Sequence, residues 1–257
     1  MKILFGDDGS TSADAAWLWV NSHEWPGWDI DVLRAVGGSS PPEARPVREF
    51  LRPEVADHLH EQTVKEDPRF ALHTRGKDYD LIVVGSKGRG LLKALHIGST
   101  AEWLIDMPTA PTVIVRGGHR TQRVLLAHDG SRHAMAAERA ILAMPWAAGL
   151  EVRVLSISDG TSDAQQVTDE ARERLQGHVA AVDAVVVGPD DLEVFYRPRD
   201  VILRHVADWN PDLVAIGSRG MTRWESLNEA ALFRAGSTAT GVANQATCSV
   251  LVARHID

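Results

Sequence analysis

Residues 79–88 read YDLIVVGSKG, and residues 211–220 read PDLVAIGSRG. Each copy has an acidic residue, four apolar residues and then a turn that begins and ends with glycine. A short apolar run of this kind is typical of a strand that is buried on both faces of a parallel sheet. Because the unit occurs twice, 132 positions apart, the sequence predicts two similar halves.

The repeat extends over the rest of the chain. Three further segments recur in the same order, with residues 3–10, 98–101 and 112–115 matching residues 124–131, 236–239 and 249–252. Matched segments in one order indicate a tandem duplication. We therefore expect two domains, 1–117 and 121–257. The joint around residues 117–121 is short, so the two halves should pack against each other.

Each half is predicted to contain five strands, in the order strand, helix, strand, connector, strand, helix, strand, helix, strand, and bounds can be given for four of the five. We expect strands at 2–7, 31–36, 81–84, 112–115, 123–128, 151–157, 213–216 and 249–253, and helices at 12–22, 99–106, 133–143 and 237–244. This alternation favours a parallel sheet with helices on both faces. The predicted fold is thus α/β, with two tandem five-stranded parallel-sheet sandwiches of Rossmann-like type.

The two halves differ in the middle. Four prolines, at positions 41, 42, 46 and 53, make a long regular helix unlikely to form in the first half, because proline lacks the N–H group and clashes with the preceding turn. The second half has room for a polar helix at 162–182.

The composition excludes several classes of protein. With 27 basic and 35 acidic residues the formal charge is −8, which disfavours non-specific binding to nucleic acid. A single cysteine, Cys248, excludes an internal disulfide framework. The N-terminus does not resemble a signal peptide and no run of about 18 apolar residues occurs, so we expect no membrane partner and a cytoplasmic protein.

The glycines point to an anion site. Gly85-Ser86-Lys87-Gly88 follows a predicted buried strand, and Gly98-Ser99-Thr100 opens a predicted helix. Glycine lets backbone N–H groups approach an anion, and a helix N-terminus adds free donors. The intervening segment contains Arg89, Lys93 and His96 but no acid. These features together would hold phosphates near the carboxyl ends of the strands, where open parallel sheets bind ligands.

Simpler interpretations remain open at these positions. Gly85 and Gly88 can serve only a strand-to-helix turn, and Ser99 with Glu102 matches a capping box. Asp8, at the end of the first strand, can accept hydrogen bonds from a ribose or an adenine amino group, or can close an Asx turn. We favour Asp8 over Asp7 because neighbouring strand residues face opposite sides.

Other candidate sites are weaker. The chain has no Walker-type phosphate loop. His58 and His60 lie two apart on one predicted strand, but no third ligand has suitable spacing, so we expect no metal site. Cys248 and the early tryptophans, Trp17, Trp19, Trp25 and Trp28, are expected to pack in the core or between the halves.

The spacing Gly85-x2-Gly88-x9-Gly98-Ser99, with Asp8-Gly9-Ser10 after the first strand and a last strand at 112–115, resembles the nucleotide-binding signature of the universal stress protein family. The resemblance covers both halves. It implies the fold of the adenine nucleotide α-hydrolase-like group and a ligand such as ATP, with or without Mg²⁺. By the same resemblance, Asp8 would contact the ribose or base and the Ala35 backbone would contact the adenine. The ribose and phosphates would lie against the glycine turn and helix start, at Gly85, Ser86, Gly88, Gly98, Ser99 and Thr100.

Family members usually associate through their last strands. The resemblance therefore implies that 112–115 pairs with 249–253 to form an intramolecular pseudo-dimer, and it leaves room for a further homodimer. In the second half, fifteen residues separate Gly220 from Gly236, against nine between Gly88 and Gly98, and the insertion contains Glu225 and Glu229 beside Arg223 and Arg234. Acidic groups near a triphosphate are unfavourable, so we expect the second half to bind ATP weakly, differently or not at all.

The leading hypothesis is a stress-response or regulatory protein that binds an adenine nucleotide in its first half. The alternative is an interaction or scaffold protein of the same fold that acts without nucleotide. We expect no enzyme, because no dedicated base or set of metal ligands is found for phosphoryl transfer, although slow ATP hydrolysis stays open.

Overall fold

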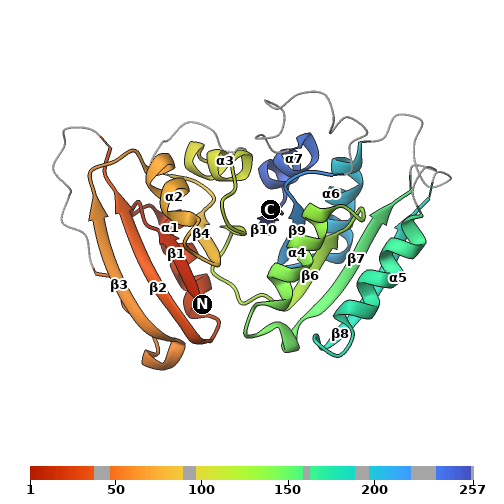
Figure 1. The fold of residues 1–257 in the computed structure, drawn as a ribbon, viewed down its shortest axis with the longest axis horizontal. Coiled ribbons are helices and arrows are strands. Elements are labelled where there is room, and N and C mark those ends of the chain that lie inside the picture. Colours follow the sequence, from red (N-terminus) through yellow and green to blue (C-terminus); the bar gives the residue numbers. More distant parts are fainter. Residues whose placement is uncertain (38–46, 89–96, 159–162, 189–196, 221–235, 256–257) are drawn as a thin grey trace.

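The computed structural model describes residues 1–257 except 38–46, 89–96, 159–162, 189–196, 221–235 and 256–257 (Figure 1). The first half contains β1 (Lys2–Gly6), α1 (Thr11–Asn21), β2 (Trp25–Ala35), β3 (Ala56–Val64), α2 (Pro68–Gly76), β4 (Leu81–Gly85), α3 (Ser99–Asp106) and β5 (Thr112–Val115). The second half contains β6 (Arg123–Ala127), α4 (Arg132–Leu142), β7 (Glu151–Ile157), α5 (Ala164–Leu175), β8 (Ala181–Val187), α6 (Pro198–Trp209), β9 (Leu213–Gly217), α7 (Ser237–Gln245) and β10 (Ser249–Ala253). Two 3₁₀ turns lie at Pro53–Val55 (η1) and Ala147–Gly149 (η2).

All ten of these strands form one sheet, in the order β3-β2-β1-β4-β5-β10-β9-β6-β7-β8. Neighbouring strands run parallel within each half, as predicted. The exception is the centre, where β5 and β10 pair antiparallel with Ile114 opposite Val250. The two predicted five-stranded sheets are therefore joined through their last strands, which confirms the expected pseudo-dimer within one chain.

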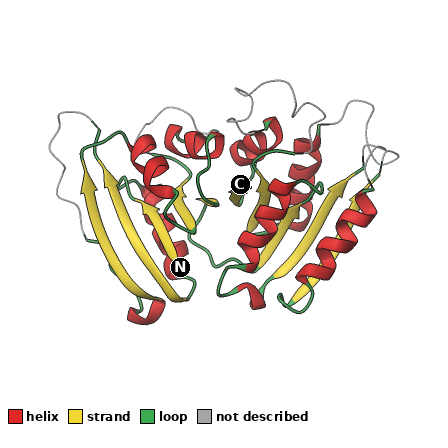
Figure 2. Ribbon diagram, in the orientation of Figure 1, coloured by secondary structure: helices red, strands yellow, loops and turns green. Residues whose placement is uncertain are grey.

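Helices cover both faces of the sheet (Figure 2). Side chains of α1, α4 and α5 pack into one apolar cluster, and side chains of α2, α3, α6 and α7 pack into another. The central strands are buried on both faces, because residues that alternate along them, such as Val83 and Val84 of β4, belong to opposite clusters. This explains why these strands are continuous apolar runs rather than alternating patterns.

The predicted helix starts are confirmed. The Ser10 hydroxyl accepts a hydrogen bond from the Ala13 N–H group (3.2 Å), and Ser131 caps α4 in the same way. The polar helix expected at 162–182 is α5. Between β2 and β3 the described residues form only the short turn η1. Part of this proline-rich segment, residues 38–46, lies outside the described residues.

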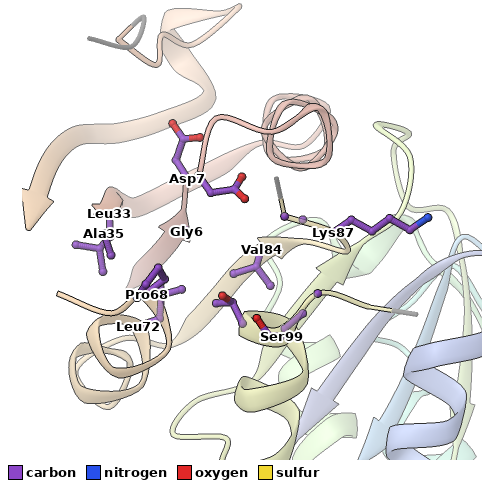
Figure 3. Close-up of a pocket in the computed structure, with 15 residues that line it drawn as sticks. Gly6, Asp7, Leu33, Ala35, Pro68, Leu72, Val84, Lys87 and Ser99 are labelled. Carbon is purple, nitrogen blue, oxygen red and sulfur yellow. The ribbon is translucent and has the colours of Figure 1, made fainter. Parts of the chain in front are cut away.

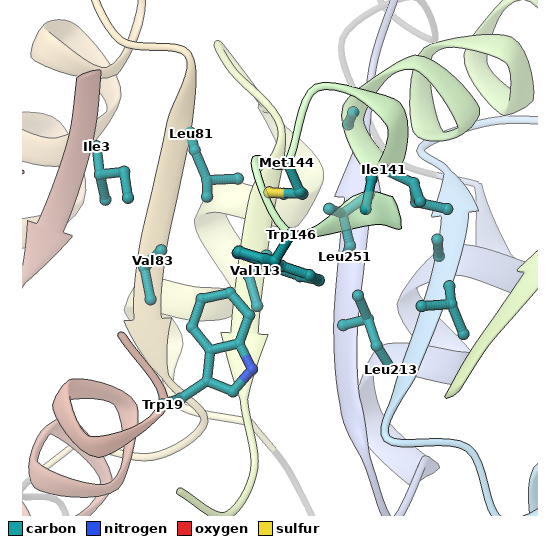
Figure 4. Packing of buried hydrophobic residues seen from close by; sticks show 14 of the residues in the cluster. Ile3, Trp19, Leu81, Val83, Val113, Ile141, Met144, Trp146, Leu213 and Leu251 are labelled. Atoms are coloured by element: carbon teal, nitrogen blue, oxygen red, sulfur yellow. The ribbon is translucent and has the colours of Figure 1, made fainter. Parts of the chain in front are cut away.

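An aromatic cluster joins the halves on one face of the sheet (Figure 4). Trp146 of the second half packs against Trp19, His23 and Trp25 of the first, at ring-centroid distances of 6.0, 4.2 and 5.7 Å. The backbone N–H of Thr121 donates to His23 Nε2 (3.0 Å), and burial lowers the pKa of His23 to about 4. The prediction of tryptophan packing between the halves is confirmed.

Candidate functional site

A pocket of about 130 Å³ lies at the carboxyl ends of β1, β2 and β4 in the first half (Figure 3). Its walls come from these strand ends, the first turn of α3 and the start of α2. Seven of the eight predicted site residues line it, namely Asp8, Ala35, Gly85, Gly88, Gly98, Ser99 and Thr100. The fold thus gathers side chains and backbone from five separate segments around one cavity.

Ser86 is the predicted site residue that does not line this pocket. Its hydroxyl lies 3.3 Å from the Ser12 hydroxyl at the start of α1, and its N–H donates to the Val115 carbonyl (3.1 Å). Ser86 therefore holds the glycine turn against α1 and β5, outside the pocket.

Close backbone approach explains the glycines. A Cβ atom on Gly85 would lie 2.6 Å from the Ser12 backbone, so the end of β4 can pack directly against α1. A Cβ on Gly98 would lie 3.1 Å from the Gly88 nitrogen, and one on Gly88 would lie 3.0 Å from the Asp8 carboxylate. The Gly98 N–H also donates to the Ser86 carbonyl (2.8 Å). These contacts bring the two glycine segments and Asp8 together.

The first turn of α3 faces the pocket without a side-chain cap. The N-cap residue is Gly98, and no side chain among the described residues hydrogen-bonds to this helix start. The capping-box interpretation of Ser99 and Glu102 is therefore wrong, since Ser99 is already the first helical residue. Backbone N–H groups at an uncapped helix start favour an anion, because they carry the positive end of the helix dipole.

The opposite wall is apolar. Leu33 and Ala35 from β2, Pro68 and Leu72 from α2, and Val84 from β4 form it. Sequence reasoning missed the α2 residues of this wall, although the sequence does indicate where α2 begins. Asp67 followed by proline is a helix start, and the Asp67 carboxylate does accept a hydrogen bond from the Arg69 N–H (2.9 Å). These five wall residues and Gly6 form an apolar slot. Beside it, the Gly85–Gly88 turn and the first turn of α3 form a polar cradle.

The two neighbouring aspartates have different surroundings. The Asp8 carboxylate accepts from the Ser10 N–H (3.0 Å) and faces Gly88. The buried Asp7 carboxylate accepts from Arg34 (3.0 Å) and Arg48 (2.8 Å). Burial alone would raise the pKa of Asp7, but the hydrogen bonds from Arg48, the Gly9 N–H and Arg34 outweigh it and lower the pKa to about 2.

The cations expected near the phosphates are only partly described. Lys87 lines the pocket through its backbone end, and its side chain extends away from the cavity (Figure 3). Arg89, Lys93 and His96 lie outside the described residues.

The second half repeats the backbone of this site. A Cβ on Gly217 would lie 2.6 Å from the Ala134 nitrogen of α4, just as a Cβ on Gly85 would lie 2.6 Å from the Ser12 backbone of α1. The Gly236 N–H donates to the Ser218 carbonyl (2.7 Å). A Cβ on Gly220 would lie 2.7 Å from the Asp129 carboxylate. The glycine turns of the two halves therefore have the same local construction.

The side chains at the matching slot positions are larger in the second half. Strand register pairs Gly6 with Leu33 and Val84, and it pairs the equivalent Ala127 with Leu155 and Ile216. Two residues further on, Ile157 stands where the first half has Ala35. Ala127, Ile157 and Ile216 thus replace Gly6, Ala35 and Val84, and each replacement adds carbon atoms at the strand ends. The insertion residues Arg223, Glu225, Glu229 and Arg234 lie outside the described residues.

Other candidate groups serve the fold. His58 lies 2.7 Å from Asp29, and within the described part of the chain no group of three or more His, Cys, Asp or Glu side chains is arranged to hold a metal ion. Cys248 is half-buried just before β10, and burial raises the pKa of its thiol to about 11. Among the helices that the structure describes, none has the length and apolar character to cross a membrane.

The sequence model of the universal stress protein family matches residues 1–116 and again residues 120–254. The chain belongs to the universal stress protein family. The two matches confirm the tandem arrangement of two universal stress protein units.

Individual universal stress proteins are similar to all or part of this chain. Universal stress protein Rv2623 of Mycobacterium tuberculosis is 29% identical over 134 residues, which are 44% of each chain, so the aligned part spans less than half the length of that relative. A universal stress protein structure from Archaeoglobus fulgidus covers 98% of both chains at a TM-score of 0.66 and 19% identity. A universal stress protein solved in complex with cAMP is 20% identical and matches 52% of this chain with 97% of its own, at a TM-score of 0.38.

Proposed function

We propose that the first half of this universal stress protein binds an adenine nucleotide, ATP being the expected ligand, and that the protein acts in regulation through this binding. The observation that carries the proposal is one pocket with two kinds of wall. An apolar slot suits a flat base, and an uncapped helix start with a glycine turn suits phosphates.

Each part of the nucleotide is assigned to one part of the pocket. The adenine would lie between Ala35 and Leu72, where the Ala35 backbone can hydrogen-bond its edge. The Asp8 carboxylate would accept hydrogen bonds from ribose hydroxyls. The phosphates would lie against Gly88 and the first-turn N–H groups of Ser99 and Thr100. A Mg²⁺ ion, where present, would be held mainly by phosphate oxygens and water.

The larger side chains at the matching positions of the second half support a single site per chain. Ile157 and Ile216 add bulk where a base would enter, so the second half would bind the nucleotide weakly or not at all. In this proposal the glycine turn of the second half is kept for its packing role against α4, since Gly217 closely approaches Ala134.

The proposal is for a binding protein rather than an enzyme. Fast phosphoryl transfer needs a positioned base or metal ligands around the γ-phosphate, and the pocket residues proposed above offer chiefly backbone donors. Turnover well above about 1 s⁻¹ would contradict this part of the proposal.

Isothermal titration of ATP into the wild type and into Gly98→Val tests the site. The valine Cβ would press on the Gly88 nitrogen, 3.1 Å away, and deform the cradle, so we expect affinity to fall by about tenfold or more. Gly236→Val is the matched control. Among the described residues, the nearest atoms to a Cβ there are 3.7 Å away, so this variant should bind ATP with the affinity of the wild type.

Thermal unfolding of each variant checks that the fold is kept. Wild-type protein that shows no binding, and that carries no adenine nucleotide when purified from cells, would favour the scaffold function instead. Equal affinity in the wild type and Gly98→Val would remove the site assignment.

A further inference from the structure

The segment that leads into the proposed phosphate cradle is held by both halves of the molecule. The Gly98 N–H donates to the Ser86 carbonyl of its own half (2.8 Å). The N–H of the preceding residue, Ile97, donates instead to the Asn244 side-chain oxygen on α7 of the second half (3.2 Å). The Ile97 side chain is buried in the apolar cluster that contains Val242 of α7.

The end of α7 that carries Asn244 is itself fixed to the first half. The Arg116 guanidinium, just beyond β5, donates to the Ala243 and Cys248 carbonyls. The Arg116 N–H also donates to the Ser249 hydroxyl at the start of β10 (3.0 Å). Because the carbonyls at a helix C-terminus lack helical partners, these bonds hold the last turn of α7 in place beside Ile97.

We propose that Asn244 of the second half is a positioning residue for the phosphate end of the nucleotide site in the first half; this inference rests on the proposed function. The Asn244 side chain fixes the backbone at residues 97–98, so that the first-turn N–H groups of α3 are already aimed at the phosphates before the ligand arrives. A preorganised site binds more tightly, since no ordering of the loop opposes binding. In this tandem arrangement, the second half therefore supplies a positioning residue for the nucleotide site of the first half.

The test is the affinity of Asn244→Leu for two probes, ATP and adenosine. Leucine removes the acceptor at similar size, so ATP should bind about three- to tenfold more weakly, as expected for one lost hydrogen bond to the backbone. Adenosine has no phosphates and should bind as it does to the wild type. Amide hydrogen exchange at Ile97 should become faster in the variant.

Two control variants sharpen the result. Asn244→Asp keeps an oxygen acceptor and should retain the slow amide exchange of wild-type Ile97, while its negative charge near the phosphates should itself weaken ATP binding. Gln245→Leu changes the neighbouring exposed residue and should have no effect. If Asn244→Leu unfolds, the shorter Asn244→Ser, which cannot reach Ile97, replaces it in both titrations.

The outcomes separate this inference from the proposed function. Unchanged ATP affinity in Asn244→Leu, or an equal loss for ATP and adenosine, overturns the positioning role while the nucleotide site stands. A wild type that binds neither probe overturns both.

Discussion

The two halves of the molecule share the backbone of their glycine turns but differ in the side chains at the ends of their strands. In both, a glycine at the end of a central strand packs against the first turn of a helix, at Gly85 and at Gly217. At the slot, however, Gly6 and Ala35 of the first half correspond to Ala127 and Ile157 of the second.

This difference separates what folding requires from what a ligand requires. The paired glycine turns are needed in both halves because a Cβ atom would collide with backbone there. The small residues of the slot are not shared by both halves, since Ala127 and Ile157 stand at their positions in the second half. Within the first half, Gly6 is also closely packed, because a Cβ there would lie 3.0 Å from the Val84 side chain and 3.1 Å from that of Leu72. In the proposed function, the small side chains at Gly6 and Ala35 leave room for the base in the first half.

The most direct test of this difference is the variant Ala35→Ile, which gives the first half the slot residue of the second half. The added carbon atoms would occupy the proposed place of the adenine, and overpacking of this kind costs about 1–3 kcal/mol. We expect ATP affinity to fall up to about 100-fold, measured by isothermal titration.

Control titrations use Ile157→Ala, which trims the second half and should leave the affinity of the first half unchanged. An Ala35→Ile variant that binds ATP like the wild type would show that the base does not use this slot.

Sequence reasoning reached the fold because the pattern is local and occurs twice. The apolar runs before Gly85 and Gly217 define central strands, and Ser10 and Ser131 define helix starts. The pairing of β5 with β10 followed from family resemblance, because nothing in four apolar residues specifies a partner strand.

Of the candidate site, sequence reasoning predicted the glycine cradle and Ala35 but missed the rest of the apolar wall. Glycine spacing along the chain indicates the cradle directly. Pro68 and Leu72 contribute through tertiary packing of α2 over the strand ends, and their own sequence gives no sign of which cavity they border. The size difference between Ala35 and Ile157 became meaningful only once the strand register made the two positions equivalent.

A second difference between the halves lies beside the slot, where Asp7 of the first half corresponds to His128 of the second. Because hydrogen bonds from Arg48 and Arg34 hold the pKa of Asp7 at about 2, the ionised carboxylate stabilises the fold. Its contribution is complete above the unfolded-state pKa of about 3.8 and disappears as the pH falls towards 2. We expect Asp7→Asn to lower the free energy of unfolding by about 2 kcal/mol at pH 6, measured by urea denaturation.

The same measurement at lower pH checks the cause. The difference between wild type and Asp7→Asn should shrink steadily between pH 4 and pH 2.5. A double-mutant cycle with Arg48→Gln should be non-additive, since the two side chains are 2.8 Å apart. A pH-independent difference would mean that Asp7 acts through its shape rather than its charge.

The smallest expected effect comes from opening the second half with the triple variant Ala127→Gly, Ile157→Ala and Ile216→Val. These substitutions recreate the slot of the first half at its three matching positions, while the glycine turn at Gly217–Gly220 is already present. If side-chain size alone closes the second half, titration should reveal a second, weaker site, with the stoichiometry rising from about one towards about two nucleotides per chain. Circular dichroism must first confirm folding, because each truncation of a buried side chain also destabilises the core. A stoichiometry that stays at one in the folded variant would show that side-chain size at these three positions does not account for the difference between the halves.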